Sequence, residues 1–387
     1  MTSPWLDPRS AYVHVPFCAH HCGYCDFAVT AGQDHLIELY LDALDAELAS
    51  LGDPRPVESV FIGGGTPTHL SPPQLERLLA SVNSRLPLSA ARGVATPEFS
   101  IESTPESWTP EKVAVAAAHG VNRVSIGVQS FRPASLTALD RRHTSDQIPR
   151  AVEVVRERIS NVSFDLIFAA PGSSPDAWLA DLREALRYGP RHVSTYGLTY
   201  EKGTPLWKQR RRGEVLPVEE DGELAMYEGA IDTLTAAGFE HYEISNFALP
   251  DFRCRHNERY WANEAYYGFG VGAARYVNGV RELNTRDTQA YIRKVLAGES
   301  PTFQSEKLGP RDRAFETIGT QLRRAEGIDR VRFAEQCGLS LDEVAGERIA
   351  GLVANGLLED VGGSVRLTHR GKCLADGVIE DLMKANS

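Results

Sequence analysis

Long hydrophobic runs and widely spread cysteines are both missing from this sequence of 387 residues. No stretch of 18 apolar residues occurs, so no transmembrane helix is predicted. Only six cysteines are present, whereas small secreted proteins that depend on disulfides carry cysteines throughout their length. Residues 1–8 contain no basic stretch followed by an apolar one, so a secretory signal peptide is not expected. Together these absences predict a soluble cytoplasmic protein.

Positive charge is also in deficit. The chain has 41 Lys and Arg residues against 52 Asp and Glu residues, a net charge of −11. This balance argues against a nucleic-acid partner, because phosphate backbones attract basic surfaces. No P-loop and no Ser-His-Asp pattern stands out, so nothing indicates a nucleotide hydrolase or a serine hydrolase. A hydrophobic content of 42% and a charged content of 24% are ordinary for folded domains.

Short apolar runs alternate with amphipathic segments in the first half of the chain. The expected strands are 12–17, 57–62, 99–102, 123–129, 162–168 and 192–198, and the expected helices are 36–51, 73–86, 110–119, 145–159 and 175–188. Nearly continuous apolar strands alternating with helices indicate a parallel sheet covered by helices. Six such units are fewer than the eight of a closed barrel. The prediction is therefore an α/β fold with a partial (β/α)6 barrel over residues 1–240.

The pattern changes near residue 305. Helices are expected at 311–324, 331–337 and 341–355, followed by two short strands at 357–360 and 365–368. Helices followed by a small hairpin predict a winged-helix-like module over residues 305–387, with residues 241–304 as a connecting region. The helix at 341–355 carries three acidic residues against one arginine, which makes it a poor surface for DNA. A role in packing or in binding a protein partner is the expectation.

Half of the cysteines lie within eight residues. Cys18, Cys22 and Cys25 have the spacing Cys-x3-Cys-x2-Cys, in the loop after the first expected strand. Three thiolates from one loop can ligate three irons of a four-iron, four-sulfur (4Fe-4S) cluster and leave the fourth iron open. Zinc is the alternative, but zinc sites usually use two separated cysteine pairs, and no second Cys-x2-Cys occurs. The spacing therefore predicts a metal centre with an open coordination position.

The segment from Tyr12 to Phe27 resembles the radical S-adenosylmethionine (radical SAM) superfamily, and the Gly-Gly-Gly-Thr-Pro motif at 63–67 agrees with it. Within the superfamily, the chain is similar to the anaerobic coproporphyrinogen oxidases and their relatives. Further matching motifs lie at 127–131, 198–201 and 242–246. The resemblance covers nearly the whole chain. It implies a 4Fe-4S cluster on Cys18, Cys22 and Cys25, with S-adenosylmethionine (SAM) chelating the fourth iron.

The same resemblance implies a set of SAM contacts, namely Tyr12, Tyr24, Gly64, Gly65, Thr66, Glu102, Gln129, Arg141 and Asp165. Tyr24, just before the third cysteine, would stack on adenine or would only shield the cluster. Glycines would let the backbone approach the methionyl end of SAM closely, or would only form a tight turn. Glu102 and Asp165 suit ribose hydroxyls or the amino group, unless they are solvated or salt-bridged acids. Arg141 is followed by Arg142 and His143, so its assignment could shift by a residue.

A second motif, His-Asn-x-x-Tyr-Trp at 256–261, resembles the mark of a heme-chaperone subgroup of this branch. It implies that His256 helps to bind heme, and imidazole is a common axial ligand of heme iron. The alternative is a histidine satisfied by packing. Cys254 could be a second iron ligand, a covalent attachment site or an inert core residue. Relatives usually carry His and Ser where this chain has Ala274 and Arg275.

Two departures weigh against the oxidases. Phe27 stands where oxidases carry a further cysteine, and only about ten residues precede the first expected strand, where oxidases have a longer segment. The resemblance therefore favours a heme chaperone that transfers heme to acceptor hemoproteins. In the family these acceptors are membrane-associated respiratory proteins. The resemblance also implies a dimer that depends on the cluster. A radical SAM enzyme of methyltransferase or cyclase type with an unidentified substrate remains the alternative, followed by coproporphyrinogen III oxidase. Whether SAM is turned over stays open.

Overall fold

A nine-stranded sheet forms the centre of the protein, seen in a computed structural model that describes residues 4–90 and 96–384. Its strand order is β11-β1-β4-β5-β6-β7-β8-β10-β9. The six strands of the expected barrel are β1 (Ser10–Val15), β4 (Ser59–Gly64), β5 (Glu98–Ser103), β6 (Arg123–Gln129), β7 (Asn161–Phe168) and β8 (His192–Gly197). Neighbours among these six pair in parallel, which confirms the predicted open α/β barrel. Residues 1–3, part of the segment examined for a signal peptide, lie outside the described range.

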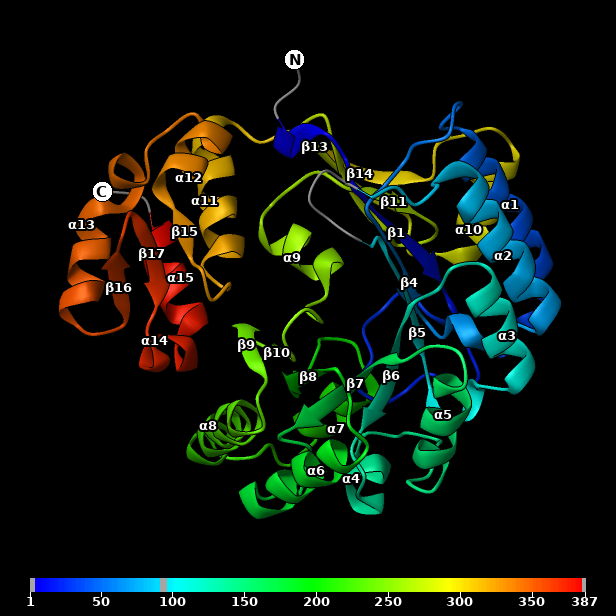
Figure 1. Ribbon diagram of the computed structural model, residues 1–387, viewed down its shortest axis with the longest axis horizontal. Coiled ribbons are helices and arrows are strands. Elements are labelled where there is room, and N and C mark those ends of the chain that lie inside the picture. The colour runs from blue at the N-terminus through cyan, green and yellow to red at the C-terminus, as the bar shows by residue number, and fades with distance from the viewer. Residues whose placement is uncertain (1–3, 91–95, 385–387) are drawn as a thin grey trace.

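Helices cover the outer side of this sheet (Figure 1). They are α1 (Ile37–Ala49), α2 (Pro72–Arg85), α3 (Pro110–Ala118), α5 (Gln147–Arg156), α6 (Pro175–Arg187) and α8 (Glu220–Ala236), with the shorter α4 (Pro133–Ala138) and α7 (Pro205–Arg211). Several begin at Ser-Pro or Thr-Pro. Thr109 and Ser174 accept a hydrogen bond from a first-turn N–H of α3 and α6, and proline follows at the first helical position, where no N–H is needed.

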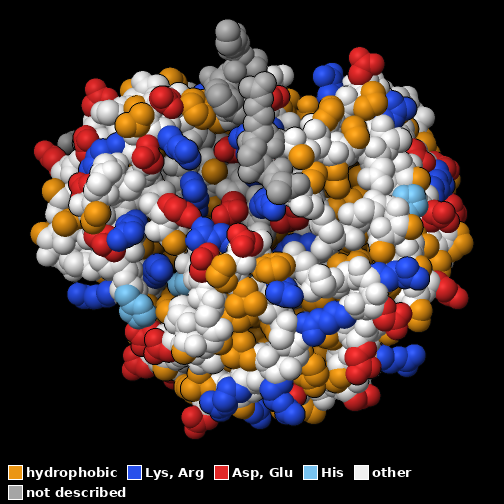
Figure 2. Space-filling view, viewed as in Figure 1, with side chains coloured by type: hydrophobic (Ala, Val, Ile, Leu, Met, Phe, Trp, Pro, Cys, Tyr) orange, Lys and Arg blue, Asp and Glu red, His pale blue; other side chains and the backbone are white. Residues whose placement is uncertain are grey.

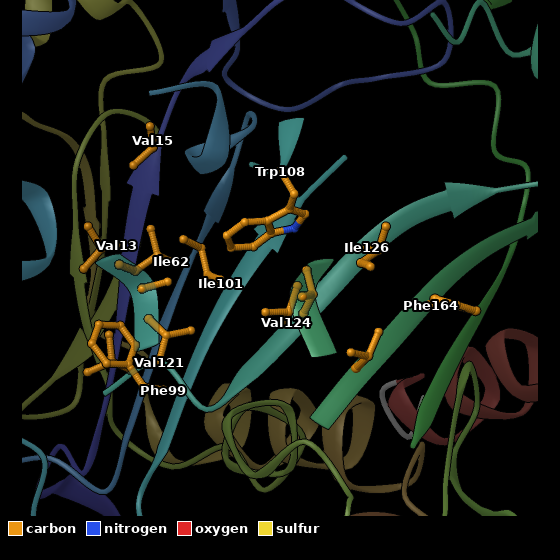
Figure 3. Close-up of a cluster of buried hydrophobic side chains, with 14 of the residues drawn as sticks. Val13, Val15, Ile62, Phe99, Ile101, Trp108, Val121, Val124, Ile126 and Phe164 are labelled. Carbon is orange, nitrogen blue, oxygen red and sulfur yellow. The ribbon is translucent and has the colours of Figure 1, made fainter. Parts of the chain in front are cut away.

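Side chains of neighbouring strands meet in the core. Figure 3 shows Val13, Ile62 and Ile101 side by side on β1, β4 and β5, with Phe99 close by. All four are fully buried. Strands buried on both faces have few polar positions, which is why they stand out in the sequence as apolar runs.

Five of the six expected strands differ from the observed ones by one or two residues at one or both ends, and two of these differences have a cause in backbone chemistry. The first strand was expected at 12–17 but ends at Val15, because Pro16 has no N–H to continue the ladder. Phe17–Cys18 instead form β2, which pairs with β3 (Thr30–Ala31) and closes the cysteine loop. The second expected strand, 57–62, extends two residues further, to Gly64, because Val15 of β1 still pairs with Gly64. The glycine motif therefore begins inside a strand.

Residues 240–306 lie mostly in the region that was expected to be a connection. Three of their strands join the main sheet, and three others form a sheet of their own. Strands β9 (Glu240–Glu243) and β10 (Asn246–Ala248) extend it antiparallel beyond β8, and β11 (Tyr267–Phe269) pairs in parallel with β1. Strands β12 (Ala274–Val277), β13 (Val280–Asn284) and β14 (Thr302–Glu306) form a separate sheet, beside helix α10 (Thr288–Leu296). Helix α9 (Arg255–Trp261) lies between these strands in the sequence.

The C-terminal module matches the winged-helix-like expectation. Its helices are α11 (Pro310–Gln321), α12 (Arg330–Cys337), α13 (Leu341–Ala354), α14 (His369–Cys373) and α15 (Ala375–Met383), and its sheet has the order β15 (Ile328–Asp329), β17 (Ser364–Leu367), β16 (Leu358–Val361). The module has its own core around Ile318 and Phe333, both fully buried. Acidic and basic side chains are interspersed over the face shown in Figure 2. Among the described helices, none has the length and apolar content needed to cross a membrane.

Candidate metal and ligand cavity

All thirteen site residues predicted from the sequence line one cavity of about 950 Å³ inside the partial barrel. The set consists of Tyr12, Cys18, Cys22, Tyr24, Cys25, Gly64, Gly65, Thr66, Glu102, Gln129, Arg141, Asp165 and His256. They come from strands β1, β2 and β4 to β7, from the loops that follow these strands, and from α9. The fold thus brings together residues separated by up to 244 positions (256 − 12) in the sequence.

The cysteine loop forms part of the cavity wall. Cys18 ends β2, and the N–H of Cys25 donates to the carbonyl of Cys22 at 3.2 Å, which turns the loop back on itself. The Thr66 hydroxyl donates to Cys18 Sγ at 3.6 Å, and Arg141 Nη1 donates to Cys22 Sγ at 3.4 Å. Burial raises the pKa of Cys18 to about 12, so a bound metal is needed to hold it as a thiolate. Three sulfur donors in one loop, two of them with hydrogen-bond donors to support a thiolate, fit an iron–sulfur cluster.

The glycine motif is packed against the chain's own atoms. A Cβ at Gly63 would lie 2.5 Å from the Glu102 carboxylate, and a Cβ at Gly64, where φ is +107°, would lie 2.4 Å from the His14 ring. At Gly65 the obstacle is backbone, since a Cβ would lie 2.6 Å from Pro16 C and O. The glycines therefore let β4, β5 and the start of the cysteine loop approach each other closely.

Substitution of Gly65 by alanine is expected to lower the free energy of unfolding by about 1–3 kcal/mol, because the added methyl group meets backbone that has to shift. Urea denaturation monitored by circular dichroism measures the change. Gly351→Ala in α13 is the matched control: its Cβ meets nothing within 4 Å, so this variant should be about as stable as the wild type or more stable by up to about 1 kcal/mol. Equal stability of the Gly65→Ala variant and the wild type would contradict the packing argument.

Two carboxylates face the same cavity. Glu102 Oε2 accepts the N–H of Gly64 at 2.9 Å, and both Asp165 oxygens accept from the Ser125 hydroxyl at 3.0 Å. Burial, and then the nearby Asp165 carboxylate, raise the pKa of Glu102 to about 7. Burial also raises the pKa of Asp165. Arg123 lies close enough to lower both pKa values in part, but burial outweighs it. Two acids held close together in one cavity form a site that favours a positively charged or hydroxyl-rich ligand.

The raised pKa of Glu102 predicts a pH-dependent effect of Glu102→Gln in the protein without SAM. The stability that protonated Glu102 provides is fully present below its ordinary pKa of 4.5 and is lost as pH rises through about 7. That difference corresponds to roughly 3 kcal/mol. The free energy of unfolding of Glu102→Gln, taken relative to that of wild type, should therefore be higher at pH 8.5 than at pH 5 by up to about 3 kcal/mol. Urea denaturation at both pH values tests this, with exposed Glu111→Gln as control, and a difference that does not change with pH would contradict it.

Arg141 bridges the cysteine loop and the strand ends. Besides Cys22, it donates through Nη2 to the carbonyl of Gly127 at 2.8 Å. Its neighbour His143 instead bonds the carbonyl of Val128 through Nε2, at 3.1 Å. The structure therefore places Arg141, rather than His143, beside the cysteines, although Arg142 also lines the cavity. Gln129 ends β6 with a φ of 62°, a left-handed conformation that non-glycine residues seldom adopt.

His256 is surrounded by aromatic rings. Its ring stacks on Phe61 with centroids 5.2 Å apart and meets Tyr260 edge-on at 4.6 Å. Nδ1 bonds the Ser59 hydroxyl at 3.3 Å, whereas Nε2 is buried without a hydrogen-bond partner among the described residues. Burial, and then the Arg123 guanidinium, lower the pKa of His256 to about 3. A neutral imidazole with an unpaired buried nitrogen in a cavity wall fits a ligand to a metal.

His256 and the cysteine loop lie at opposite ends of the strands. Its partner Ser59 is the first residue of β4, and Glu98, which accepts the His256 N–H at 3.4 Å, is the first residue of β5. The glycine motif, which touches the cysteine loop, contains the last residues of β4. Five residue steps along a strand span about 17 Å. The cavity therefore extends along the barrel from the carboxyl to the amino ends of its strands.

Helix α9 is held from two sides. Glu98 accepts the N–H of Arg255 at 3.0 Å and the thiol of Cys254 at 3.4 Å. The C-terminal module binds the residues after α9, because Gln336 donates to the carbonyl of Asn263 at 2.7 Å and Arg323 lies over the Trp261 ring. Cys254 is fully buried and is not among the cavity-lining residues described. The C-terminal module thus fixes the helix that carries His256.

Among the lining residues that the sequence analysis did not name, three contact or neighbour the predicted site residues closely. Phe61 stacks on His256, Arg123 is 2% exposed at the start of β6, and Ser125 holds Asp165. Arg123 could have been noticed, because an arginine inside an apolar strand is rarely buried without a partner. Phe61 and Ser125 give no such signal, since a phenylalanine and a serine are ordinary in strands.

The chain is similar to known protein families and to named proteins over nearly its whole length. The Radical SAM superfamily matches residues 12–185, and the HemN C-terminal domain matches residues 308–374. A protein of Lactococcus lactis called heme chaperone HemW is 35% identical and covers 97% of both chains. Proteins of the same name from Bacillus subtilis, at 35% identity, and Escherichia coli, at 33%, cover 96% and 97% of this chain and 98% of their own lengths.

One solved structure shares the fold along the whole chain. Coproporphyrinogen III oxidase (HemN) from Escherichia coli, described as a radical SAM enzyme, superposes with a TM-score of 0.84. The match covers 98% of this chain and 91% of the oxidase, at 22% identity. Identity this low carries the fold only, and the fold is the barrel and C-terminal module expected from the sequence.

Proposed function

The chain belongs to the heme chaperone HemW family within the radical SAM superfamily, and on that premise we propose that it binds heme and passes it to acceptor hemoproteins. The observation that carries the proposal is His256, whose neutral imidazole lies in the cavity wall with a buried nitrogen that has no hydrogen-bond partner within residues 4–90 and 96–384. Phe61 and Tyr260 supply flat aromatic surface beside it. A porphyrin is a flat, apolar ligand whose iron takes an axial nitrogen, so this environment suits its chemistry.

The same cavity supports the proposal of a 4Fe-4S cluster with SAM. Cys18, Cys22 and Cys25 would hold the cluster, which when bound offers SAM an iron with an open coordination position. Arg141 and Thr66 would stabilise the thiolates through the hydrogen bonds described above. Glu102 and Asp165 would bind the hydroxyl and ammonium groups of SAM and offset its sulfonium charge.

The distance between the two ends of the cavity supports separate binding of heme and SAM. Most residues that would contact SAM lie near the carboxyl ends of β4 and β5, whereas His256 lies at their amino ends, about 17 Å away along β4. Tyr12 is the exception, because its ring lies 6.5 Å from the His256 ring, so the two ligands would share at most this side chain. We therefore expect SAM to be exchangeable without displacing heme.

A radical SAM enzyme of methyltransferase or cyclase type with an unidentified substrate is the second candidate. The observation in its favour is that every SAM contact implied by the sequence lines the cavity, with Glu102 and Asp165 close together beside the glycine motif. A chaperone that only carries heme does not need SAM to be consumed. Substrate-dependent formation of 5′-deoxyadenosine would favour this candidate over the chaperone.

Anaerobic titration of the cluster-loaded protein with heme tests the proposed function. We expect the heme absorption band to saturate near one heme per chain, with a dissociation constant that SAM changes less than about twofold. Transfer is then measured by mixing the heme-loaded protein with an apo-hemoprotein and following the acceptor's spectrum. Absence of saturable binding, or heme that no apo-acceptor can take up, would contradict the chaperone role.

A further inference from the structure

A second group of metal-ligating side chains lies where the C-terminal module meets the barrel. Glu228 is on the barrel helix α8, and His369 and Cys373 are on α14. One ligand atom from each residue lies within 4.8 Å of the other two. None of the three lines the heme and SAM cavity. The group is therefore independent of the site described above.

We propose that Glu228, His369 and Cys373 bind a divalent transition-metal cation of the Zn²⁺ type. A carboxylate oxygen, an imidazole nitrogen and a thiolate sulfur are the three donor types that zinc uses in proteins. Hard cations such as Mg²⁺ and Ca²⁺ prefer oxygen ligands alone, so the sulfur and nitrogen donors exclude them as the preferred ion. Three protein ligands would leave a fourth tetrahedral position for water.

Local geometry supports convergence of the three donors. His369 and Cys373 are four residues apart in a helical turn, so their side chains lie on the same face. Glu228 comes from a different module and completes the group from the opposite side. Glu228 and Cys373 are partly buried and His369 is exposed, which leaves an entry path for an ion.

The three side chains have little else to bind. In the described parts of the chain, neither the Glu228 carboxylate nor the His369 imidazole has a hydrogen-bond or ion-pair partner. Among the described residues, the Cys373 thiol has one hydrogen-bond partner, the His369 carbonyl of its own helix at 3.5 Å, and its side chain also packs against the edge of the barrel core. Side chains held close together by the fold, without protein partners, are free to coordinate a cation.

Charged neighbours of the site change the pKa of the Cys373 thiol, one raising it and one lowering it. Burial, and then the Glu228 carboxylate, raise the pKa of the Cys373 thiol. A divalent cation between the carboxylate and the sulfur would turn this repulsion into attraction to a shared ion. Lys372 has the opposite effect and lowers the pKa of Cys373 in part. Its ammonium lies 3.3 Å from Nδ1 of His241 on β9, so it already has a partner outside the proposed site.

Binding at this position would link two parts of the fold. Helices α8 and α14 are in contact, and α8 belongs to the barrel while α14 belongs to the C-terminal module that holds α9. A ligand that binds only the folded arrangement stabilises it by mass action. Zinc is therefore expected to raise the melting temperature of the protein.

The test is a zinc titration of the cluster-loaded protein against a chromophoric chelator of micromolar affinity, so that the cluster cysteines are already occupied. We expect one equivalent of Zn²⁺ per chain to be withheld from the chelator. Cys373→Ser and His369→Ala should each weaken binding at least tenfold, and both should lose the rise in melting temperature. Cys337→Ser, which changes another buried cysteine of the same module, is the matched control and should bind like wild type.

Two results would overturn the proposal. One is wild-type protein that withholds no zinc from the chelator. The other is zinc affinity in Cys373→Ser and His369→Ala equal to that of wild type, which would mean that the ion binds elsewhere. Neither readout uses heme or SAM. Because the titration starts from cluster-loaded protein, the iron content is measured first, so that failure to form the cluster is told apart from failure of the zinc site.

Discussion

Replacement of Cys22 by alanine is expected to lower bound iron from about four atoms per chain to near zero after anaerobic reconstitution. Within the described residues, the loop offers three sulfur donors to the cavity, and a cluster held by three thiolates loses one of its iron attachments when Cys22 is removed. The substitution also leaves Arg141 Nη1 without the sulfur it donates to, so this half-buried cation keeps only its bond to the Gly127 carbonyl and the more distant Glu106 carboxylate. Iron and sulfide analysis, together with the absorption near 400 nm, measures the loss.

The control for Cys22→Ala is Cys337→Ser, which removes a thiol from the C-terminal core and should keep the full iron content. Circular dichroism separates loss of the cluster from loss of the fold, because Cys22 is only half-buried in a loop and its removal should leave the barrel intact. Retention of four irons by folded Cys22→Ala protein would contradict the assignment of the cluster to the three cysteines.

The barrel could be predicted because its strands are buried on both faces. Arg123–Gln129 is a fully buried strand whose bounds agree with the expectation, and the other five differ by one or two residues at one or both ends. The errors have local causes. Pro16 ends β1 early, and Gly63 and Gly64 pair within β4 although glycine has low strand propensity.

The region after residue 240 could not be predicted in the same way. Strand β11 has three residues, and its place beside β1 depends on pairing with residues more than 250 positions away. Strand β14 is mostly exposed, so no apolar periodicity marks it. Short strands of mixed polarity are recognised only through their partners, which a sequence pattern does not contain.

The site was predicted as a set of residues but not as an arrangement. Resemblance and spacing named thirteen residues, and all of them line the cavity. The pKa of Glu102 and the unpaired nitrogen of His256 could not be predicted, because both depend on burial by residues distant in sequence. That His256 and the cysteines lie at opposite ends of the strands follows from the contact of α9 with Ser59 and Glu98.

Replacement of His256 by alanine is expected to weaken heme binding at least tenfold, which corresponds to about 1.4 kcal/mol or more. The substitution removes the buried nitrogen available to the iron and leaves only the aromatic surface of Phe61 and Tyr260. The pKa of about 3 also predicts how binding depends on pH. An imidazole with an ordinary pKa near 6.5 would be about nine-tenths protonated at pH 5.5 and would lose about tenfold in affinity. His256 stays neutral there, so wild-type affinity should change little between pH 8 and pH 5.5.

His241→Ala is the matched control, since burial lowers the pKa of the partly buried His241 to about 4, yet its ring stacks on Phe247 outside the cavity. Its variant should bind heme like wild type at both pH values. Heme titrations of the three proteins, with iron content measured in parallel, separate the two ends of the cavity: His256→Ala should lose heme and keep the cluster, whereas Cys22→Ala should lose the cluster and keep heme. Equal heme affinity in His256→Ala and wild type would move the heme site away from α9. A tenfold loss of wild-type affinity at pH 5.5 would instead mean that an exposed histidine carries the iron.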